Sequence, residues 1–283
     1  MFNEGQASKG KIMEQPIIRV EDISKSFVSE GGKNDLSVLK NINLDIRENE
    51  FVCIVGPSGC GKSTLLRILA GLEASTEGRV VYRGQTLNKP TREIGLVFQN
   101  YSLMPWLNVE DNIALGLDFK KLPREDKQNT VDKYLKIIGL ESFRRSMPHE
   151  LSGGMQQRVA IARSLANDPD VVLMDEPFGA LDAYTRIQLQ KELLRIWQQD
   201  KKTIIFVTHS VDEAIYLADR IILMSKRNGS IEQDIRVDMP RIRDRSDQRY
   251  ARLNQTLLDE LEQLNNIQSQ PPRMDQTQST TSG

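Results

Sequence analysis

The stretch Gly-Pro-Ser-Gly-Cys-Gly-Lys-Ser-Thr at residues 56–64 constrains this chain more than any other. An apolar run at 51–55 precedes it, and a segment with helical spacing of apolar residues follows it. The spacing fits the phosphate-binding loop G-x-x-x-x-G-K-[ST], in which glycines let backbone N–H groups approach phosphate oxygens. The helix that follows such a loop points its positive end at the same phosphates. The stretch therefore predicts a strand, a phosphate-binding turn and a helix.

Three side chains of this loop have separate expected roles. Lys62 is expected to reach the β- and γ-phosphates, and the Ser63 hydroxyl is expected to bind Mg²⁺. Thr64 continues the helix start with a hydroxyl that can satisfy a free amide or a phosphate oxygen. The alternative, a flexible glycine turn with a surface lysine, does not explain the strand before it and the helix after it. The predicted nucleotide-binding residues are Gly56, Pro57, Ser58, Gly59, Cys60, Gly61, Lys62, Ser63 and Thr64.

Charge and hydropathy exclude several classes of protein. The 283 residues carry a formal net charge of −1, which argues against a nucleic-acid partner because such domains are usually strongly basic. No window approaches 18 consecutive apolar residues, and the start lacks an apolar leader, so we expect neither a membrane span nor a secretory signal. The two cysteines, Cys53 and Cys60, have no metal-ligand spacing and are expected to be free thiols in a reducing cytosol.

Two later strands are predicted to lead into ionisable residues that could act in metal binding or catalysis. The apolar run 171–174 leads into Asp175 and Glu176, as expected for a buried parallel strand with carboxylates at its carboxyl end. Asp175 is placed to hold a metal and Glu176 to orient or deprotonate an attacking water, although an acidic strand end could also simply cap the next helix. The strand 203–207 leads to His209, which we expect to contact a γ-phosphate at the same edge of the sheet.

Other segments leave alternatives open. Ser152, Gly153 and Gly154 open a second helix and could bind phosphate, but taken alone they are better explained by a simple serine N-cap. Phe27 is either core of a small antiparallel sheet or a ring that stacks on a purine base. The apolar loop 100–109 is either packed on the core or a docking patch for another chain. A helical insertion is expected over 110–147, and the arginines between 236 and 249 alternate with aspartates as in a mixed solvated surface.

Taken together, these motifs resemble the ATP-binding subunit of ATP-binding cassette (ABC) transporters, over about residues 17–235. The signature motif of that family usually ends in glutamine, whereas this chain has Met155, so we expect tuned rather than lost activity. The matching segments are the Walker A loop (56–64), the Q-loop (Gln99), the signature motif (151–155), Walker B (171–176), the D-loop (180–182) and the switch histidine (His209).

The resemblance implies an α/β fold: a P-loop NTPase core of the RecA-like type, an N-terminal antiparallel β subdomain and an α-helical signature subdomain at about 100–158. It implies ATP and Mg²⁺ as cofactors, and Phe27 stacked on adenine. By this resemblance the catalytic residues are Glu176, His209, Gln99 and Lys62, the metal is held by Ser63, Gln99 and Asp175, and ATP is also contacted by Ser152, Gly153, Gly154 and Asp182. Outside the ATPase domain at 17–235 we expect a disordered lead at 1–16, an extension with one helix at 236–264 and a disordered tail at 265–283.

The resemblance also implies partners. A second copy would bind head to tail, so that ATP on Lys62 of one copy is covered by Ser152 of the partner subunit. Separate permease subunits would hold the chain at the cytoplasmic face of the membrane, with the 101–107 loop as the docking surface, and an extracytoplasmic solute-binding protein would act indirectly. Segments 102–109 and 240–245 look most like importers for nitrate, aliphatic sulfonates or taurine, with another solute as an alternative. A soluble ABC-type ATPase of translation or DNA repair fits less well, because the chain has one phosphate loop and no long heptad run. A nucleotide sensor without turnover is disfavoured by the presence of Glu176.

Overall fold

The computed structural model describes residues 15–28, 36–99, 101–120, 122–179, 181–226 and 229–266. The first half of the chain forms a four-stranded antiparallel sheet in the order β2-β1-β4-β5. This sheet confirms the expected N-terminal antiparallel subdomain. The run Gly-Gly-Lys-Asn-Asp at 31–35, whose composition predicts a hairpin turn between the first strands, lies outside the described residues. Its strands are β1 (Ile18–Phe27), β2 (Leu36–Ile46), β4 (Glu77–Tyr82) and β5 (Gln85–Thr86).

A second sheet of six strands has the order β10-β9-β3-β8-β7-β6, with β10 antiparallel to β9 and the other pairs parallel. Val55 pairs with Thr208 and Asp175 pairs with Val207, so β3, β7 and β8 end at the same level. Parallel strands in register deliver the residues that follow them to one edge of the sheet. The strands are β3 (Phe51–Val55), β6 (Ile94–Val97), β7 (Val171–Asp175), β8 (Thr203–Thr208), β9 (Arg220–Met224) and β10 (Ile231–Arg236).

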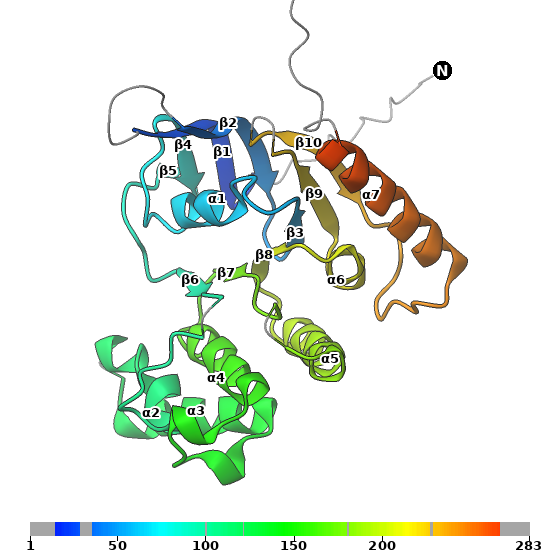
Figure 1. The fold of residues 1–283 in the computed structure, drawn as a ribbon. Helices are drawn as coiled ribbons and strands as arrows, with labels where there is room; N and C mark the ends of the chain where they lie inside the picture. The colour runs from blue at the N-terminus through cyan, green and yellow to red at the C-terminus, as the bar shows by residue number, and fades with distance from the viewer. Residues whose placement is uncertain are drawn as a thin grey trace, which may run out of the picture.

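Both faces of this sheet are covered, which explains why β3 is apolar at every position. Val52 and Ile54 pack in a core shared with the first sheet and α1 (Lys62–Leu69), which lies between the two sheets (Figure 1). Phe51 and Cys53 point to the opposite face and pack in a second core with α5 (Ala183–Gln199) and α6 (Val211–Leu217). Both cysteines are buried free thiols.

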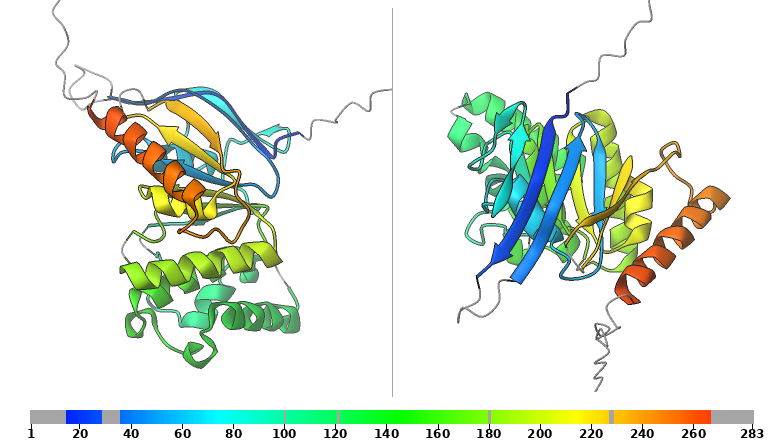
Figure 2. Two further views of the ribbon diagram at one scale, coloured as in Figure 1. Left: turned by 90° about the vertical axis from the view of Figure 1, so that its right-hand side faces the viewer. Right: turned by 90° about the horizontal axis from the view of Figure 1, so that it is seen from above.

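A group of helices forms a separate layer beyond the core sheet, with α5 between the two (Figure 2). The helical periodicity predicted for 110–147 is confirmed, and its expected interruption falls at Pro123, just before α3. The helical subdomain is expected to end near residue 158, but α4 continues through that position to Ala166. The elements are α2 (Val109–Ala114), η1 (Leu117–Lys120), α3 (Arg124–Ile138), η2 (Glu141–Phe143), η3 (Pro148–Glu150) and α4 (Gly153–Ala166).

The segment between β6 and α2 combines the two arrangements that its sequence allowed. Tyr101 and Leu103 pack against the core, whereas the Trp106 side chain is 71% exposed. The fully buried Asn112 side chain holds the segment, because its amide donates to the carbonyl oxygens of Met104 (3.2 Å) and Leu107 (2.8 Å). The exposed tryptophan is thus presented from a fixed backbone.

The one helix expected in the C-terminal extension is α7 (Gln248–Asn266), which packs against α6 (Figure 2) and contributes Tyr250 and Leu257 to the same core. The Leu257 side chain is completely buried. None of the helices in the described ranges is both long and apolar enough to cross a bilayer.

The prediction that the arginines of 236–249 form a solvated surface is wrong for three of them. Arg243 is only 5% exposed and donates to the carbonyl oxygen of Ile215 (2.7 Å), and Arg241 donates to that of Leu217. These carbonyls belong to the last turn of α6, where helix geometry leaves them without an intrahelical partner. Arg245 binds both carboxylate oxygens of Asp212, in the first turn of α6. The arginines therefore fasten the extension to both ends of α6.

Replacement of Arg243 by methionine should lower the free energy of unfolding by about 2–4 kcal/mol, because buried carbonyl oxygens lose a charged donor. Urea unfolding followed by circular dichroism measures this. Arg249→Met is the matched control, since Arg249 is exposed and its ion-pair partner is the nearby Asp247, just before α7. Equal stability of the two variants would contradict the structural role of Arg243.

Candidate nucleotide-binding site

The loop between β3 and α1 has the backbone shape that its glycines predicted. Gly59 and Gly61 have positive φ angles of 80° and 97°, which residues with a side chain rarely adopt. Gly61 is the residue directly before α1, so the loop delivers the chain to the positive end of that helix. The Cys60 side chain turns inward, and burial raises the pKa of its thiol.

Lys62 is a buried cation that only neutral groups contact in the described part of the chain. Its side chain is 5% exposed, and Nζ donates to the carbonyl oxygens of Gly56 (2.8 Å) and Pro57 (3.1 Å). A buried ammonium without an anionic partner is unfavourable, so this position is suited to an anion. The lysine therefore fits a phosphate-bearing ligand seated on the loop.

Ser63, in the first turn of α1, lies next to Asp175, at the end of β7. The Ser63 hydroxyl donates to Asp175 Oδ1 at 2.9 Å. Burial raises the pKa of Asp175, and the hydrogen bond from Ser63 opposes this rise. A hydroxyl and a carboxylate are the hard oxygen ligands that Mg²⁺ prefers. Over the described ranges, no three His, Cys, Asp or Glu side chains gather as a metal site. A cation here would therefore complete its shell with phosphate oxygens and water, as Mg²⁺ commonly does.

Glu176 and His209 face each other at the same edge. Glu176 Oε2 lies 3.2 Å from Nδ1 of His209, and the Glu176 N–H donates to the Val207 carbonyl oxygen at 3.0 Å. Glu176 has φ 43°, a left-handed conformation that costs energy for a residue with a side chain. The carboxylate is thus held beside His209 by strained but hydrogen-bonded backbone. Such strain is typical of functional sites.

Ser152 and Asp182 are both helix N-caps. Ser152 Oγ accepts from the Met155 N–H at 3.3 Å, and Asp182 Oδ1 accepts from the Thr185 N–H at 2.9 Å. The latter hydrogen bond lowers the pKa of Asp182. α4 and α5 approach closely here, since a Cβ on Gly154 would lie 2.6 Å from Thr185 Cγ2. In the described part of the chain, no hydrogen bond or ion pair joins Ser152, Gly153 or Asp182 to the 56–64 loop.

The two remaining predicted residues are exposed. Phe27 lies at the end of β1 with 40% of its surface accessible, and Lys25 Nζ lies 4.8 Å from its ring centroid. Its exposure argues against the alternative that it is plain core. Gln99 follows β6 and lines a cavity of about 450 Å³ together with His149 and Gln156. The structure does not bring Gln99 into contact with Ser63 or Asp175.

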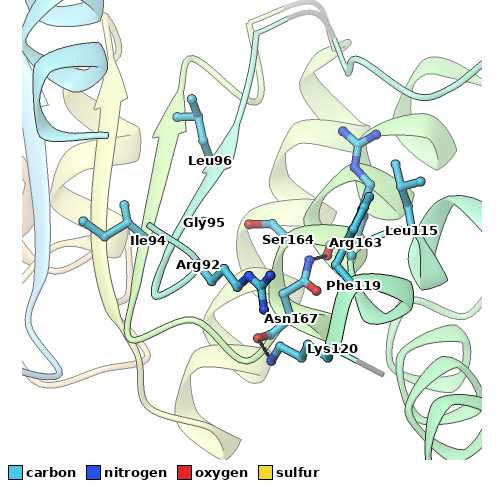
Figure 3. Close-up of a pocket in the computed structure, with 11 residues that line it drawn as sticks. Arg92, Ile94, Gly95, Leu96, Leu115, Phe119, Lys120, Arg163, Ser164 and Asn167 are labelled. Atoms are coloured by element: carbon cyan, nitrogen blue, oxygen red, sulfur yellow. Dashed lines mark hydrogen bonds between the residues drawn. The ribbon is translucent and has the colours of Figure 1, made fainter. Parts of the chain in front are cut away.

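Sequence reasoning missed a second cavity, of about 490 Å³, between the edge strand β6 and α4 (Figure 3). Phe119 and Arg163 lie on its wall, and Lys120 at its rim bonds to the Asn167 carbonyl oxygen. Ser164 Oγ is buried there, and no described group hydrogen-bonds to it. No local pattern signals this cavity, because it forms only when β6, η1 and α4 pack together.

Comparison with known proteins identifies the chain. The family model described as ABC transporter matches residues 39–179. An uncharacterized ABC transporter ATP-binding protein of Methanocaldococcus jannaschii is 51% identical over 85% of this chain and 90% of its own length. The aliphatic sulfonates import ATP-binding protein of Bacillus cereus is 46% identical over 87% of this chain and 96% of its own length.

Solved structures agree with this match. An ATP-binding cassette solved as a dimer in a post-hydrolysis state, bound to ADP and Pi, has a TM-score of 0.70 and 36% identity. The alignment covers 79% of this chain and 100% of that one. The α/β architecture is thus that of a known family. This chain belongs to the ABC transporter family, as an ATP-binding ATPase cassette.

Proposed function

We propose that this chain is the ATP-hydrolysing subunit of an ABC importer that takes up a small anion through separate membrane subunits. The observation that carries the proposal is the meeting of Lys62, the Ser63–Asp175 pair and the Glu176–His209 pair at one edge of the core sheet. An aliphatic sulfonate is the favoured solute, because a relative covering most of the chain is named for sulfonate import. Taurine, nitrate and other solutes remain sequence-based alternatives.

Each residue has a role in hydrolysis under this proposal. Lys62 exchanges a loop carbonyl for phosphate oxygens. Ser63 and Asp175 would hold Mg²⁺, which would neutralise charge on the phosphates. Glu176 accepts a proton from, or orients, the attacking water. His209 holds the Glu176 carboxylate in place and contacts the γ-phosphate, and Gln99 would be a further ligand for the cation. The exposed ring of Phe27 stacks on adenine.

Glu176→Gln should lower the rate of ATP hydrolysis by at least about a hundredfold while ATP binding is kept, because an amide cannot take a proton from water. Phosphate release and binding of a fluorescent ATP analogue measure the two properties. The matched control is Glu192→Gln on α5, where the half-buried carboxylate pairs with Arg195; this change should leave both properties unchanged. Hydrolysis by Glu176→Gln at the wild-type rate would contradict the assigned role.

We further propose a head-to-tail dimer. Ser152 and Gly153 offer a helix N-terminus suited to phosphate, yet no contact joins them to the loop of the same chain. In a two-fold dimer they would close on the nucleotide at Lys62 of the other copy. Binding of ATP would then favour the closed dimer, and hydrolysis would release it.

Mixing two inactive variants tests this arrangement. A dimer of one Lys62→Ala copy and one Ser152→Arg copy has one intact site if the site is shared between copies, and none if it lies within one chain. In a Glu176→Gln background we therefore expect the mixture to retain one ATP per two chains, and neither variant alone to retain any. Gel filtration with radiolabelled ATP measures this, and a mixture without trapped ATP would contradict the head-to-tail dimer.

The permease subunits are proposed to dock on the helical layer and hold the chain at the cytoplasmic face of the membrane. Trp106 (71%) and Phe119 (68%) expose large apolar side chains there, and Phe119 also lines the cavity beside β6 (Figure 3). Exposed apolar surface of this kind is typical of protein–protein contacts.

Trp106→Ser should reduce co-purification with the permease at least about tenfold, since central aromatic side chains carry much of the energy of an interface. Basal ATP hydrolysis should be unchanged. Leu258→Ser is the matched control, because Leu258 is an exposed apolar residue on α7. Undiminished permease binding by Trp106→Ser would exclude this docking surface.

A further inference from the structure

A cluster of buried polar side chains lies directly behind His209. Thr208, Glu213 and Gln190 are 2%, 4% and 1% exposed, and they come from β8, α6 and α5. None of them has a role in the hydrolysis mechanism described above. Buried polar groups are costly unless they are paired, so the partners of these side chains indicate what the cluster does.

Thr208 precedes His209 in the sequence and Glu213 follows it, and their side chains are hydrogen-bonded to each other. The Thr208 hydroxyl donates to Glu213 Oε2 at 2.5 Å, and its oxygen accepts from the Ser210 N–H at 3.0 Å. The Glu213 N–H in turn donates to Ser210 Oγ at 3.3 Å. The His209 side chain itself is 54% exposed and is therefore held mainly through its neighbours. The hydrogen bonds among Thr208, Ser210 and Glu213 thus link the residues directly before and after His209 to the start of α6.

The other oxygen of Glu213 reaches the helix that follows Asp182. Glu213 Oε1 lies 3.6 Å from Nε of Arg186, and Arg186 donates to the carbonyl oxygen of Leu181 at 3.0 Å. Leu181 directly precedes Asp182, the N-cap of α5. One buried carboxylate thus contacts the segment that carries His209 and the segment that carries Asp182.

The cluster also extends to the C-terminal extension. Arg245 donates to Gln190 Oε1 at 2.7 Å and binds both oxygens of Asp212, the residue before Glu213. Burial raises the pKa of Glu213, and the hydrogen bond from Thr208 and the charge of Arg186 oppose this rise. Four charged groups therefore take part in the polar contacts of this cluster: Glu213 with Arg186, and Asp212 with Arg245.

We propose that the buried Thr208–Glu213 pair positions His209 for hydrolysis, and that it couples His209 to the Asp182 segment through Arg186. Thr208 and Glu213 are positioning residues, since neither faces the phosphate loop. Loss of the Thr208 hydroxyl would remove its hydrogen bond to Glu213 and let His209 shift. Small misplacements of a group that contacts the reacting atoms strongly reduce the rate of the reaction. This inference rests on the proposed function, because it assumes that His209 acts in ATP hydrolysis.

The same strand offers a matched pair of variants. Thr208→Val removes the hydroxyl behind His209 at nearly constant volume. Thr203→Val makes the same change at the opposite end of β8, where Thr203 is fully buried and accepts one hydrogen bond from the Asn49 N–H (3.0 Å). Thr208→Ser keeps the hydroxyl and serves as the conservative rescue.

We expect Thr208→Val to lower kcat for ATP hydrolysis at least about tenfold with little change in KM for ATP. Thr208→Ser should keep the wild-type kcat, and Thr203→Val should lose thermal stability but keep kcat. In a double-mutant cycle, Glu213→Leu added to Thr208→Val should cause little further loss, because the two residues act as one unit. Melting temperatures of all variants are measured in parallel.

The proposal is overturned if Thr208→Val keeps the wild-type kcat, or if Thr203→Val loses as much kcat for the same loss of stability. Failure of the proposed function gives a different result: the wild-type chain does not hydrolyse ATP, or Glu176→Gln hydrolyses it normally. Suppose that the wild-type chain hydrolyses ATP, that Glu176→Gln does not, and that Thr208→Val keeps the wild-type kcat. This result refutes the positioning role and leaves the proposed function standing.

Discussion

The parallel register of β3, β7 and β8 is the constraint on which the rest of the structure depends. Val55 lies level with Thr208, and Asp175 lies level with Val207, so the three chains leave the sheet at one edge. A shift of one residue in either pairing would turn every side chain of that strand to the opposite face. Burial of both faces of β3 prevents such a shift, because its alternating residues fill two different cores. Packing of the strands on both faces of the core sheet therefore sets the positions of the reacting groups.

The sequence predicted those parts of the site that follow directly from a strand end. Lys62, Asp175, Glu176 and His209 each come within a few residues of a continuous apolar run, and parallel strands leave little choice of edge. The burial of Arg243 could not be predicted in this way. Its partner carbonyl at Ile215 is 28 residues away, and the flanking aspartates give the segment the alternating charge of a surface. The alternation of charges describes only the local sequence. Whether Arg243 is buried depends instead on distant groups, here the α6 carbonyl oxygens that need a hydrogen-bond donor.

The helix caps clarify how one residue can serve both folding and ligand binding. Ser152 Oγ accepts a hydrogen bond from the Met155 N–H, which occupies one lone pair and leaves the hydroxyl proton available. The cap therefore stabilises α4 and still leaves a donor for an anion. Met155 contributes only its backbone N–H to the cap, so the glutamine usual at this position in the family is not required for it.

The contacts that the C-terminal extension makes with α6 indicate how much of the chain folds as one cooperative unit. α6 has only seven residues, too few for a helix to persist without tertiary support. Arg241 and Arg243 cap its last carbonyls, and Arg245 and Tyr250 hold Asp212 in its first turn. A chain stopped after β10 would keep every motif of the nucleotide site but lose all four anchors. Motif boundaries and folding boundaries thus differ in this protein, and exchanging C-terminal segments between related cassettes would alter the segment that carries His209.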